Sequence, residues 1–227
     1  MKQLILNLKI AENKNSYSAE NFVTLAENSA AKNLLEQFFK QKEFPQAQFK
    51  SLILKGAKAS GKTHLLNIFA KQDSVNFLEI TKITKQNLVK FLKKNQFYIL
   101  ENIHEIKNEE LLLHLINSVS EAKSFLILSC ENKQDFALKD LTSRLKNIFT
   151  TEIKNPNLET IKMLLINAFS RRQIKVSDHI VDFIANNISR SYEAIFKAAE
   201  LIEKYCNESG KNITLQTVTR IICDSKI

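Results

Sequence analysis

Short apolar runs alternate with amphipathic stretches between residues 51 and 153. Runs without polar alternation predict strands that are covered on both faces. These runs are Ser51–Lys55, Val75–Ile80, Phe97–Leu100, Phe125–Ser129 and Ile148–Ile153. Apolar residues repeat at helical spacing over Thr63–Lys71, Lys85–Lys94 and Glu109–Ala122. Because strands alternate with helices, the sequence predicts an α/β fold with right-handed crossovers and a five-stranded parallel sheet.

The pattern changes after Pro156, which two asparagines flank. No strand pattern follows, and apolar residues repeat with a period near 3.6 to the end of the sequence. The helical stretches are Leu158–Arg172, Asp178–Asn187, Tyr192–Cys206 and Leu215–Cys223. The sequence thus predicts a nucleotide-binding α/β domain over residues 21–155 and a small all-helical domain over residues 156–227. The polar residues 9–20 predict a linker that separates the first eight residues from both domains.

A phosphate-binding loop follows the first predicted strand. Residues 56–63 fit the pattern GxxxxGK[ST] at every defined position, between a strand and a helix. Its glycines let successive backbone N–H groups turn toward an anion, and the next helix points its positive end at the phosphates. In this pattern Lys62 reaches the β- and γ-phosphates, and the Thr63 hydroxyl binds Mg²⁺. The predicted phosphate-loop residues are Gly56, Ala57, Lys58, Ala59, Ser60, Gly61, Lys62 and Thr63.

Polar residues follow two other predicted strands. Glu101 can hold Mg²⁺ at the end of Phe97–Leu100, but Asn102 stands where a second acid would polarise water. An amide cannot accept a proton, so we expect weak intrinsic hydrolysis or none. Ser129 and Asn132 are candidates for sensing a γ-phosphate, with an ordinary polar loop as the alternative.

Two arginines are candidate cations for nucleotide chemistry. Arg144 lies in an amphipathic helix, where it is either a solvated cation or an arginine finger that reaches a neighbour's nucleotide. Arg190 follows Ser189 at a predicted helix start. It either folds back onto this chain's own phosphates or remains solvated beside a capping serine.

The composition excludes little. Of 227 residues, 44% are hydrophobic and 25% charged, which is typical of a globular protein. The formal charge of +9 fits contact with nucleic acid, but the lysines are spread along the chain and also fit a compositional bias. No apolar run approaches the ~20 residues that span a bilayer, and the first residues make a poor secretory signal. Three cysteines without a CxxC pair favour a cytoplasmic setting.

Together these motifs resemble the DnaA family of AAA+ ATPases over nearly the whole chain. Tyr17–Val23, with Asn28 and Ala31, is similar to the family's N-terminal segment, which packs around adenine. The resemblance implies that Phe22, Val23 and Asn28 bind the nucleotide, as does His64, which continues the phosphate loop in the family's manner. The resemblance also implies that the helical domain is a lid over the nucleotide-binding domain.

The resemblance also assigns the two arginines. Asp140–Leu145 resembles the arginine-finger box, so Arg144 is the expected finger acting in trans, and Arg190 falls at the lid's sensor II position. The size of the chain resembles the shorter, Hda-like members of the family. We therefore expect neither the initiator's DNA-reading helix-turn-helix domain nor its N-terminal domain.

The first eight residues resemble a peptide that binds the DNA polymerase sliding clamp. The pattern QLxLPL is matched by Gln3, Leu4, Leu6 and Leu8, whereas Asn7 replaces its proline. The alternative is a strand of this chain's own sheet. The resemblance implies ADP or ATP with Mg²⁺ as ligands, and the sliding clamp and the initiator DnaA as partners. It also implies a homodimer as one arrangement, indirect contact with DNA, no membrane, and a cytoplasmic, nucleoid-associated location.

Three functions are compatible with these features. The first is a regulator that binds ADP and the clamp, inserts Arg144 into the ATP site of the initiator and thereby restrains replication initiation. The second is an adaptor that tethers a partner to the clamp or to DNA without a catalytic role. The third is an initiator-like or helicase-loader-like ATPase acting on single-stranded DNA, and the formal charge of +9 is compatible with it.

Overall fold

The computed structural model describes residues 22–40, 50–71, 75–84, 86–132, 135–209 and 213–225. The predicted linker and the first eight residues lie outside the described residues. The clamp-binding prediction for Gln3, Leu4, Leu6 and Leu8 therefore stays a prediction.

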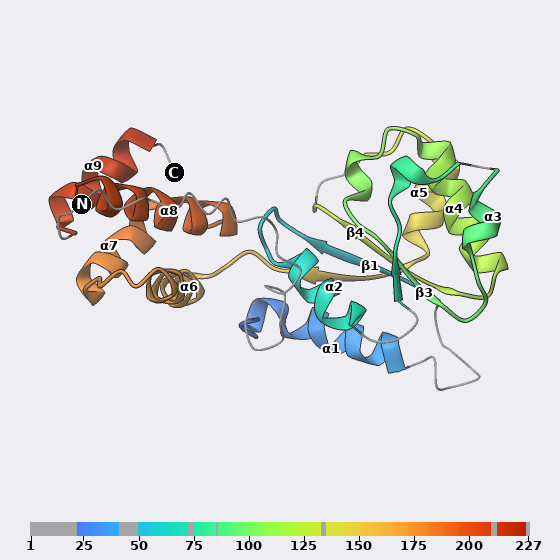
Figure 1. Cartoon of the computed structure of the whole chain (residues 1–227), viewed down its shortest axis with the longest axis horizontal. Coiled ribbons are helices and arrows are strands. Elements are labelled where there is room, and N and C mark those ends of the chain that lie inside the picture. The colour runs from blue at the N-terminus through green and yellow to red at the C-terminus, as the bar shows by residue number, and fades with distance from the viewer. Residues whose placement is uncertain are drawn as a thin grey trace, which may run out of the picture.

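A five-stranded parallel sheet forms the centre of the larger lobe, as the apolar runs predict (Figure 1). Its strand order is β2-β3-β4-β1-β5. The inner strands β3 and β4 are buried along their whole length, in agreement with strands covered on both faces. The strands are β1 (Ser51–Gly56), β2 (Val75–Phe77), β3 (Phe97–Leu100), β4 (Phe125–Cys130) and β5 (Phe149–Ile153).

Helices cover both faces of the sheet (Figure 1). We call the sheet and these helices together the sheet lobe. On one face, α1 (Ala26–Lys40) and α2 (Lys62–Ala70) pack over a core rich in phenylalanine. On the other face, α3 (Leu88–Phe91), α4 (Glu109–Glu121) and α5 (Lys139–Lys146) cover an aliphatic core. A short 3-10 turn, η5 (Ile103–Glu105), follows β3.

The second strand and the helix after it are shorter than predicted. β2 ends at Phe77 rather than Ile80, and residues Ile80–Lys82 form a 3-10 turn, η4. The Asn87 side chain accepts a hydrogen bond from the Thr84 N–H and donates one to the Lys82 carbonyl. This side-chain turn occupies the residues where the helix was expected, so α3 begins only at Leu88.

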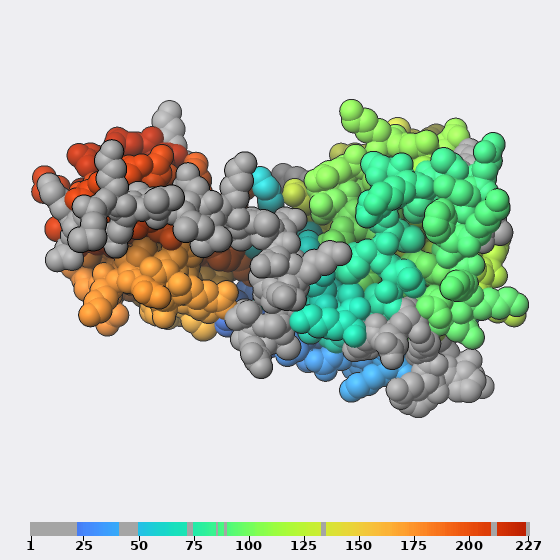
Figure 2. Space-filling model, in the orientation of Figure 1, coloured from blue at the N-terminus to red at the C-terminus, as the bar shows by residue number. Residues whose placement is uncertain are grey.

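The helical residues after the sheet form a separate core, and we call them the helical lobe. Its helices are α6 (Leu158–Arg171), α7 (Asp178–Asn187), α8 (Tyr192–Ser209) and α9 (Leu215–Ser225). Their apolar faces meet in one cluster that includes Ile161, Ile184 and Ile195. In Figure 2 the helical lobe is coloured orange to red, and the sheet lobe beside it runs from blue through green to yellow.

Glu27 joins the two lobes. The residue is 7% exposed, and its carboxylate accepts hydrogen bonds from the Thr160 hydroxyl at 2.9 Å and from the Asn157 N–H at 3.3 Å. The Glu27 carbonyl accepts a third bond from the Lys154 N–H at 3.1 Å. A carboxylate at the start of α6 also interacts favourably with the positive end of the helix. Glu27 therefore fixes the point where the helical lobe leaves the sheet lobe.

Tyr192 makes a second junction. The first residue of α8, it packs into the core beneath α1 and α2, and its hydroxyl donates a hydrogen bond to the Lys154 carbonyl at 2.9 Å. Burial, assisted by the nearby Glu27 carboxylate, raises the pKa of Tyr192 to about 12. The ring thus anchors α8 to the sheet lobe as a neutral phenol.

We expect Glu27→Ala to lower the free energy of unfolding by about 1–3 kcal/mol, because it leaves the buried Thr160 hydroxyl and the Asn157 N–H without a carboxylate acceptor. Urea unfolding followed by circular dichroism measures the change. Glu36→Ala, on the same helix, is the matched control and should stay close to wild type. Equal stability of the two variants would contradict the role of Glu27.

Candidate functional site

The loop between β1 and α2 has the geometry that the phosphate-loop pattern predicts. Gly61 precedes α2 in the left-handed region with φ 92°, and Ala59 has φ 60°. A Cβ on Gly56 would lie 2.7 Å from the Ser60 Oγ and 3.2 Å from the Ile153 Cβ. Glycine is therefore required at Gly56 for space and favoured at Gly61 for its torsion.

Lys62 lies inside this loop. Its side chain is buried, and its Nζ donates hydrogen bonds to the carbonyls of Gly56 at 2.8 Å and Ala57 at 2.9 Å. Burial lowers the pKa of Lys62, and the field of Glu131 partly opposes this effect. An anion seated beside the amine would raise that pKa again, since an opposite charge favours the ammonium form.

Glu101 and Thr63 meet next to the loop, as predicted for a metal-binding pair. The Thr63 hydroxyl donates a hydrogen bond of 2.6 Å to the Glu101 Oε1. Asn102, the next residue, is exposed and has φ 53°. Its backbone N–H donates to the hydroxyl of Ser129 at 3.1 Å. The ends of β3 and β4 are thereby fixed to each other beside the phosphate loop.

These residues fit a nucleotide phosphate with Mg²⁺. Ser60 Oγ is buried in the loop without a hydrogen-bond partner among the described residues. A hydroxyl and a carboxylate are ligands that Mg²⁺ prefers, and Thr63 and Glu101 already lie within hydrogen-bond distance of each other. The loop thus offers a cation, a spare hydroxyl and a pair of oxygen ligands in one place.

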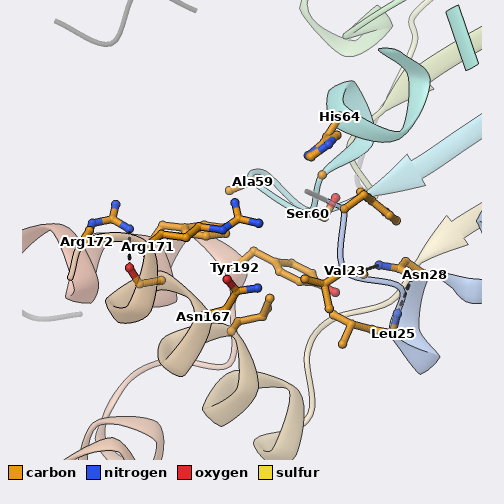
Figure 3. A pocket seen from close by; sticks show the side chains of 15 residues that line it. Val23, Leu25, Asn28, Ala59, Ser60, His64, Asn167, Arg171, Arg172 and Tyr192 are labelled. Atoms are coloured by element: carbon orange, nitrogen blue, oxygen red, sulfur yellow. Dashed lines mark hydrogen bonds between the residues drawn. The ribbon is translucent and has the colours of Figure 1, made fainter. Parts of the chain in front are cut away.

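A cavity of about 310 Å³ opens between the phosphate loop and the helical lobe (Figure 3). Its walls come from the segment before α1, from the loop, from α6 and from the start of α8. Of the residues predicted to bind nucleotide, the cavity brings together Phe22, Val23, Asn28, Ala59, Ser60, Gly61 and His64. An apolar wall of the cavity is formed by Leu25, Leu164, Ala168, Tyr192 and Phe196. The remaining lining residues are polar: Asn167, Arg171 and Arg172.

The segment before α1 is shaped by Asn28. The Asn28 Oδ1 accepts from the Leu25 N–H at 2.9 Å, and its Nδ2 donates to the Val23 carbonyl at 3.0 Å. Phe22 packs edge-on against His64, with ring centroids 5.2 Å apart. Asn28 therefore holds the wall of the cavity in place through the backbone.

The tip of the phosphate loop contacts the helical lobe directly. Lys58 Nζ forms an ion pair with Glu193 Oε1 of α8 at 2.8 Å. This hydrogen bond, together with the charge of Glu193, raises the pKa of Lys58. Both side chains are exposed, so salt screens the pair and it contributes little to stability.

The two sensor I candidates have different surroundings. Ser129 is fully buried and bonded to Asn102, whereas Asn132 is exposed and donates to Glu152 Oε1 at 2.7 Å. Glu131 lies between them in sequence. Its charge opposes the lowering of the Lys62 pKa that burial causes. Glu131 is not among the predicted site residues, although it is acidic and follows the same strand.

Arg144 lies away from the cavity. It is exposed on α5, and its Nε and Nη2 donate to the Asn117 Oδ1 of α4 at 3.1 and 2.6 Å. It lines a different hollow, with Asn117 and Asp140 among its neighbours, and no ion pair joins Arg144 to Asp140 in the described part of the chain. Arg144 therefore does not face this chain's own phosphate loop.

Arg190 is exposed and is not among the residues that line the cavity. The arginines that line it are Arg171 and Arg172, at the end of α6. Neither arginine is among the residues predicted to bind nucleotide. The helical spacing of Leu164, Ala168 and Arg171 is the signal that could have placed Arg171 on the cavity side of α6.

Within the described residues, no helix is long and apolar enough to cross a membrane. The same part of the chain contains no cluster of three or more His, Cys, Asp or Glu side chains that could bind a metal by themselves.

Sequence comparison finds similarity to replication initiators. No family model matches the chain. It is 23% identical over 235 residues to the chromosomal replication initiator protein DnaA of Helicobacter hepaticus, covering 93% of this chain and 51% of the relative. An uncharacterised protein of Haemophilus influenzae is 27% identical over 196 residues, covering 74% and 79%. The chain thus spans about half the length of the DnaA sequences that it matches.

Solved structures show the same fold. Domain III of Thermotoga maritima DnaA superposes with a TM-score of 0.69 at 18% identity, covering 92% of this chain and 96% of that domain. DnaA bound to AMPPCP and single-stranded DNA gives 0.65 at 16% identity, covering 86% and 68%. The Thermotoga maritima Holliday-junction motor RuvB gives 0.67 at 16% identity, covering 91% and 71%. The fold is therefore the AAA+ fold, as in domain III of DnaA.

We expect Gly56→Ala to destabilise the protein by about 1–3 kcal/mol, because the new Cβ would overlap the Ser60 Oγ. Ser60→Ala alone should cost little, since its hydroxyl has no partner to lose among the described residues. The double variant should therefore recover part of the loss, with the contact to Ile153 remaining. Urea unfolding of the three variants measures this coupling, and strict additivity would contradict the packing argument.

Proposed function

We propose that this chain is a regulatory AAA+ module that binds ADP or ATP with Mg²⁺ and acts on the ATP site of a partner. The observation that carries the proposal is the separation of two features. The phosphate loop and its cavity lie on one side of the sheet lobe, whereas Arg144 is held on α5 outside that cavity. A site that holds a nucleotide and a finger that serves another site are the two halves of such a module.

Nucleotide binding is supported by the loop and by the cavity together. The apolar wall formed by Leu164, Ala168 and Tyr192 suits a planar base, and the Ala59–Gly61 wall leads to the phosphate loop. Solved DnaA structures of the same fold contain AMPPCP. Bound Mg²⁺ would neutralise phosphate charge, with Thr63 and Glu101 as its protein ligands.

Slow hydrolysis by the chain itself is supported by Asn102. Its side chain is an amide and cannot take a proton from water, and its backbone is fixed by Ser129. The hydrogen bond that Glu101 accepts from Thr63 supports a role for Glu101 in holding Mg²⁺ rather than in activating water. The nucleotide would therefore hold the chain in one conformation more than it would be consumed.

Action in trans is supported by the way Arg144 is held. Asn117 orients the guanidinium with a neutral oxygen, so the full positive charge remains on an exposed surface. Such a cation can stabilise the charge that develops on a phosphoryl group bound by a neighbouring AAA+ protein. The sequence similarity to DnaA makes the initiator the partner that we propose, with the sliding clamp as the platform if the first eight residues bind it.

Two alternatives remain. A tethering adaptor would need the first eight residues but not Lys62. An initiator-like ATPase would bind single-stranded DNA, as the similar DnaA in complex with AMPPCP does, and its DNA affinity would fall steeply with salt. Lys62→Ala separates the adaptor, whose recruitment it would leave intact, from the regulator, and deletion of residues 1–8 is the control that would abolish recruitment in both. A DNA-binding titration over salt concentration separates the initiator-like ATPase from the regulator.

We expect Lys62→Met to weaken ADP binding by about tenfold or more, because a charge-assisted contact to phosphate is lost. Titration calorimetry measures the affinity. Wild type should also take up protons on binding ADP at alkaline pH below 10.5, since the pKa of Lys62 is lowered and the phosphate raises it again. Heats measured in two buffers of different ionisation enthalpy report this uptake, which Lys62→Met should reduce.

We expect Arg144→Ala to abolish the stimulation of ATP hydrolysis by purified DnaA in the presence of DNA-loaded clamp. A finger arginine contributes roughly a thousandfold or more to such a rate. Phosphate release measures it, and Lys146→Ala, a cation on the same helix, is the matched control. Stimulation that survives in Arg144→Ala while ADP binding is intact would overturn the trans role.

A further inference from the structure

The helix α6 ends with two arginines whose side chains go different ways. Arg172 is held within the helical lobe, since its Nε donates to Glu203 Oε2 at 2.7 Å and its Nη1 donates to the Ala168 carbonyl at 3.1 Å. Figure 3 shows Arg171 reaching in the other direction, into the cavity and toward Ala59 and Ser60. Consecutive residues lie about 100° apart around a helix, which explains the divergence.

Arg171 belongs to the face of α6 that forms the cavity wall. Leu164, Asn167, Ala168 and Arg171 all line the cavity, at the spacing that places residues on one helix face. The first of these residues pack near the apolar part of the cavity, and Arg171 ends the row. The row therefore runs from an apolar surface suited to a base to a cation suited to phosphate.

The opposite wall is positive as well. Ala59, Ser60 and Gly61 lead into α2, whose N-terminal end attracts anions. An anion bound there would lie between this wall and the Arg171 guanidinium. Because Glu27 fixes the start of α6 against the sheet lobe, the helix presents Arg171 to the loop from a defined position.

We propose that Arg171, and not Arg190, is the cation of the helical lobe that binds the diphosphate of the nucleotide. This inference rests on the proposed nucleotide site and names a further residue of it. A guanidinium can bind two phosphate oxygens at once, which an ammonium group cannot do with the same geometry. Arg171 lines the cavity beside Ala59–Gly61, whereas Lys62 and Thr63, expected at the terminal phosphate and Mg²⁺, do not line it.

This position predicts which ligands depend on Arg171. A contact to the phosphates shared by ADP and ATP affects both nucleotides alike. It leaves the binding of adenosine unchanged, because adenosine has no phosphate. A contact to the γ-phosphate would instead weaken ATP alone.

Calorimetric titrations of the full chain with ADP, ATP and adenosine test the proposal. We expect Arg171→Ala to weaken ADP and ATP by about tenfold each, Arg171→Lys to recover part of the affinity, and adenosine to bind as to wild type. Arg220→Ala, an exposed arginine of the helical lobe that does not line the cavity, is the matched control, and Arg190→Ala tests the position that the family resemblance assigns. Both variants should bind ADP within about twofold of wild type, since neither arginine lines the cavity.

The outcomes separate this inference from the proposed function. Wild type that binds ADP, with Arg171→Ala binding equally well, overturns the role of Arg171 alone. Loss of affinity in Arg190→Ala without loss in Arg171→Ala assigns the contact to Arg190 and also overturns it. Wild type that binds no adenine nucleotide overturns both the site and the residue. Urea unfolding of each variant shows whether it is folded, which an exposed arginine at a helix end should not affect.

Discussion

The position of one lobe against the other depends on the buried carboxylate of Glu27. It accepts hydrogen bonds from Thr160 and Asn157 at the start of α6, and its backbone carbonyl holds Lys154. Because the cavity is built from both lobes, this junction sets its width. Tyr192 reinforces it by bringing α8 onto the core beneath α1 and α2. A chain that lost this junction would keep its sheet and its phosphate loop but lose the wall opposite the loop.

In the proposed function, the sheet lobe separates two kinds of phosphate chemistry. The phosphate loop offers its backbone geometry and the buried amine of Lys62, and the cavity beside the loop has a largely apolar wall. Arg144 is exposed and held by the neutral amide of Asn117, so its charge is neither buried nor paired among the described residues. The first arrangement suits tight retention of a ligand, and the second suits brief contact with another protein. One fold can thus keep a nucleotide and still present a cation elsewhere.

The sequence predicts most of the sheet lobe because its strands are continuous apolar runs and its phosphate loop is a local pattern. The lengths of β2 and α3 could not be predicted from the hydrophobic pattern, since a 3-10 turn at Ile80–Lys82 follows β2, and the Asn87 side chain forms a turn with Thr84 and Lys82 before α3. The helix α1 is not among the predicted helices. Its N-terminal part was assigned to a family motif, although its apolar residues recur at helical spacing. The spacing of Leu164, Ala168 and Arg171 places Arg171 on one face of α6, but only the tertiary structure shows that this face lines the cavity, and no spacing pairs Asn117 with Arg144.

The carbonyl contacts of Lys62 have one further consequence. A lysine side chain in solution samples many rotamers, and restricting them costs up to about 2 kcal/mol. In this loop two carbonyl oxygens and surrounding side chains already restrict the Lys62 amine. That entropy is therefore lost when the protein folds, and little of it remains to be lost when a phosphate arrives. The loop is preorganised for its ligand, at the cost of a buried amine that the rest of the fold must stabilise.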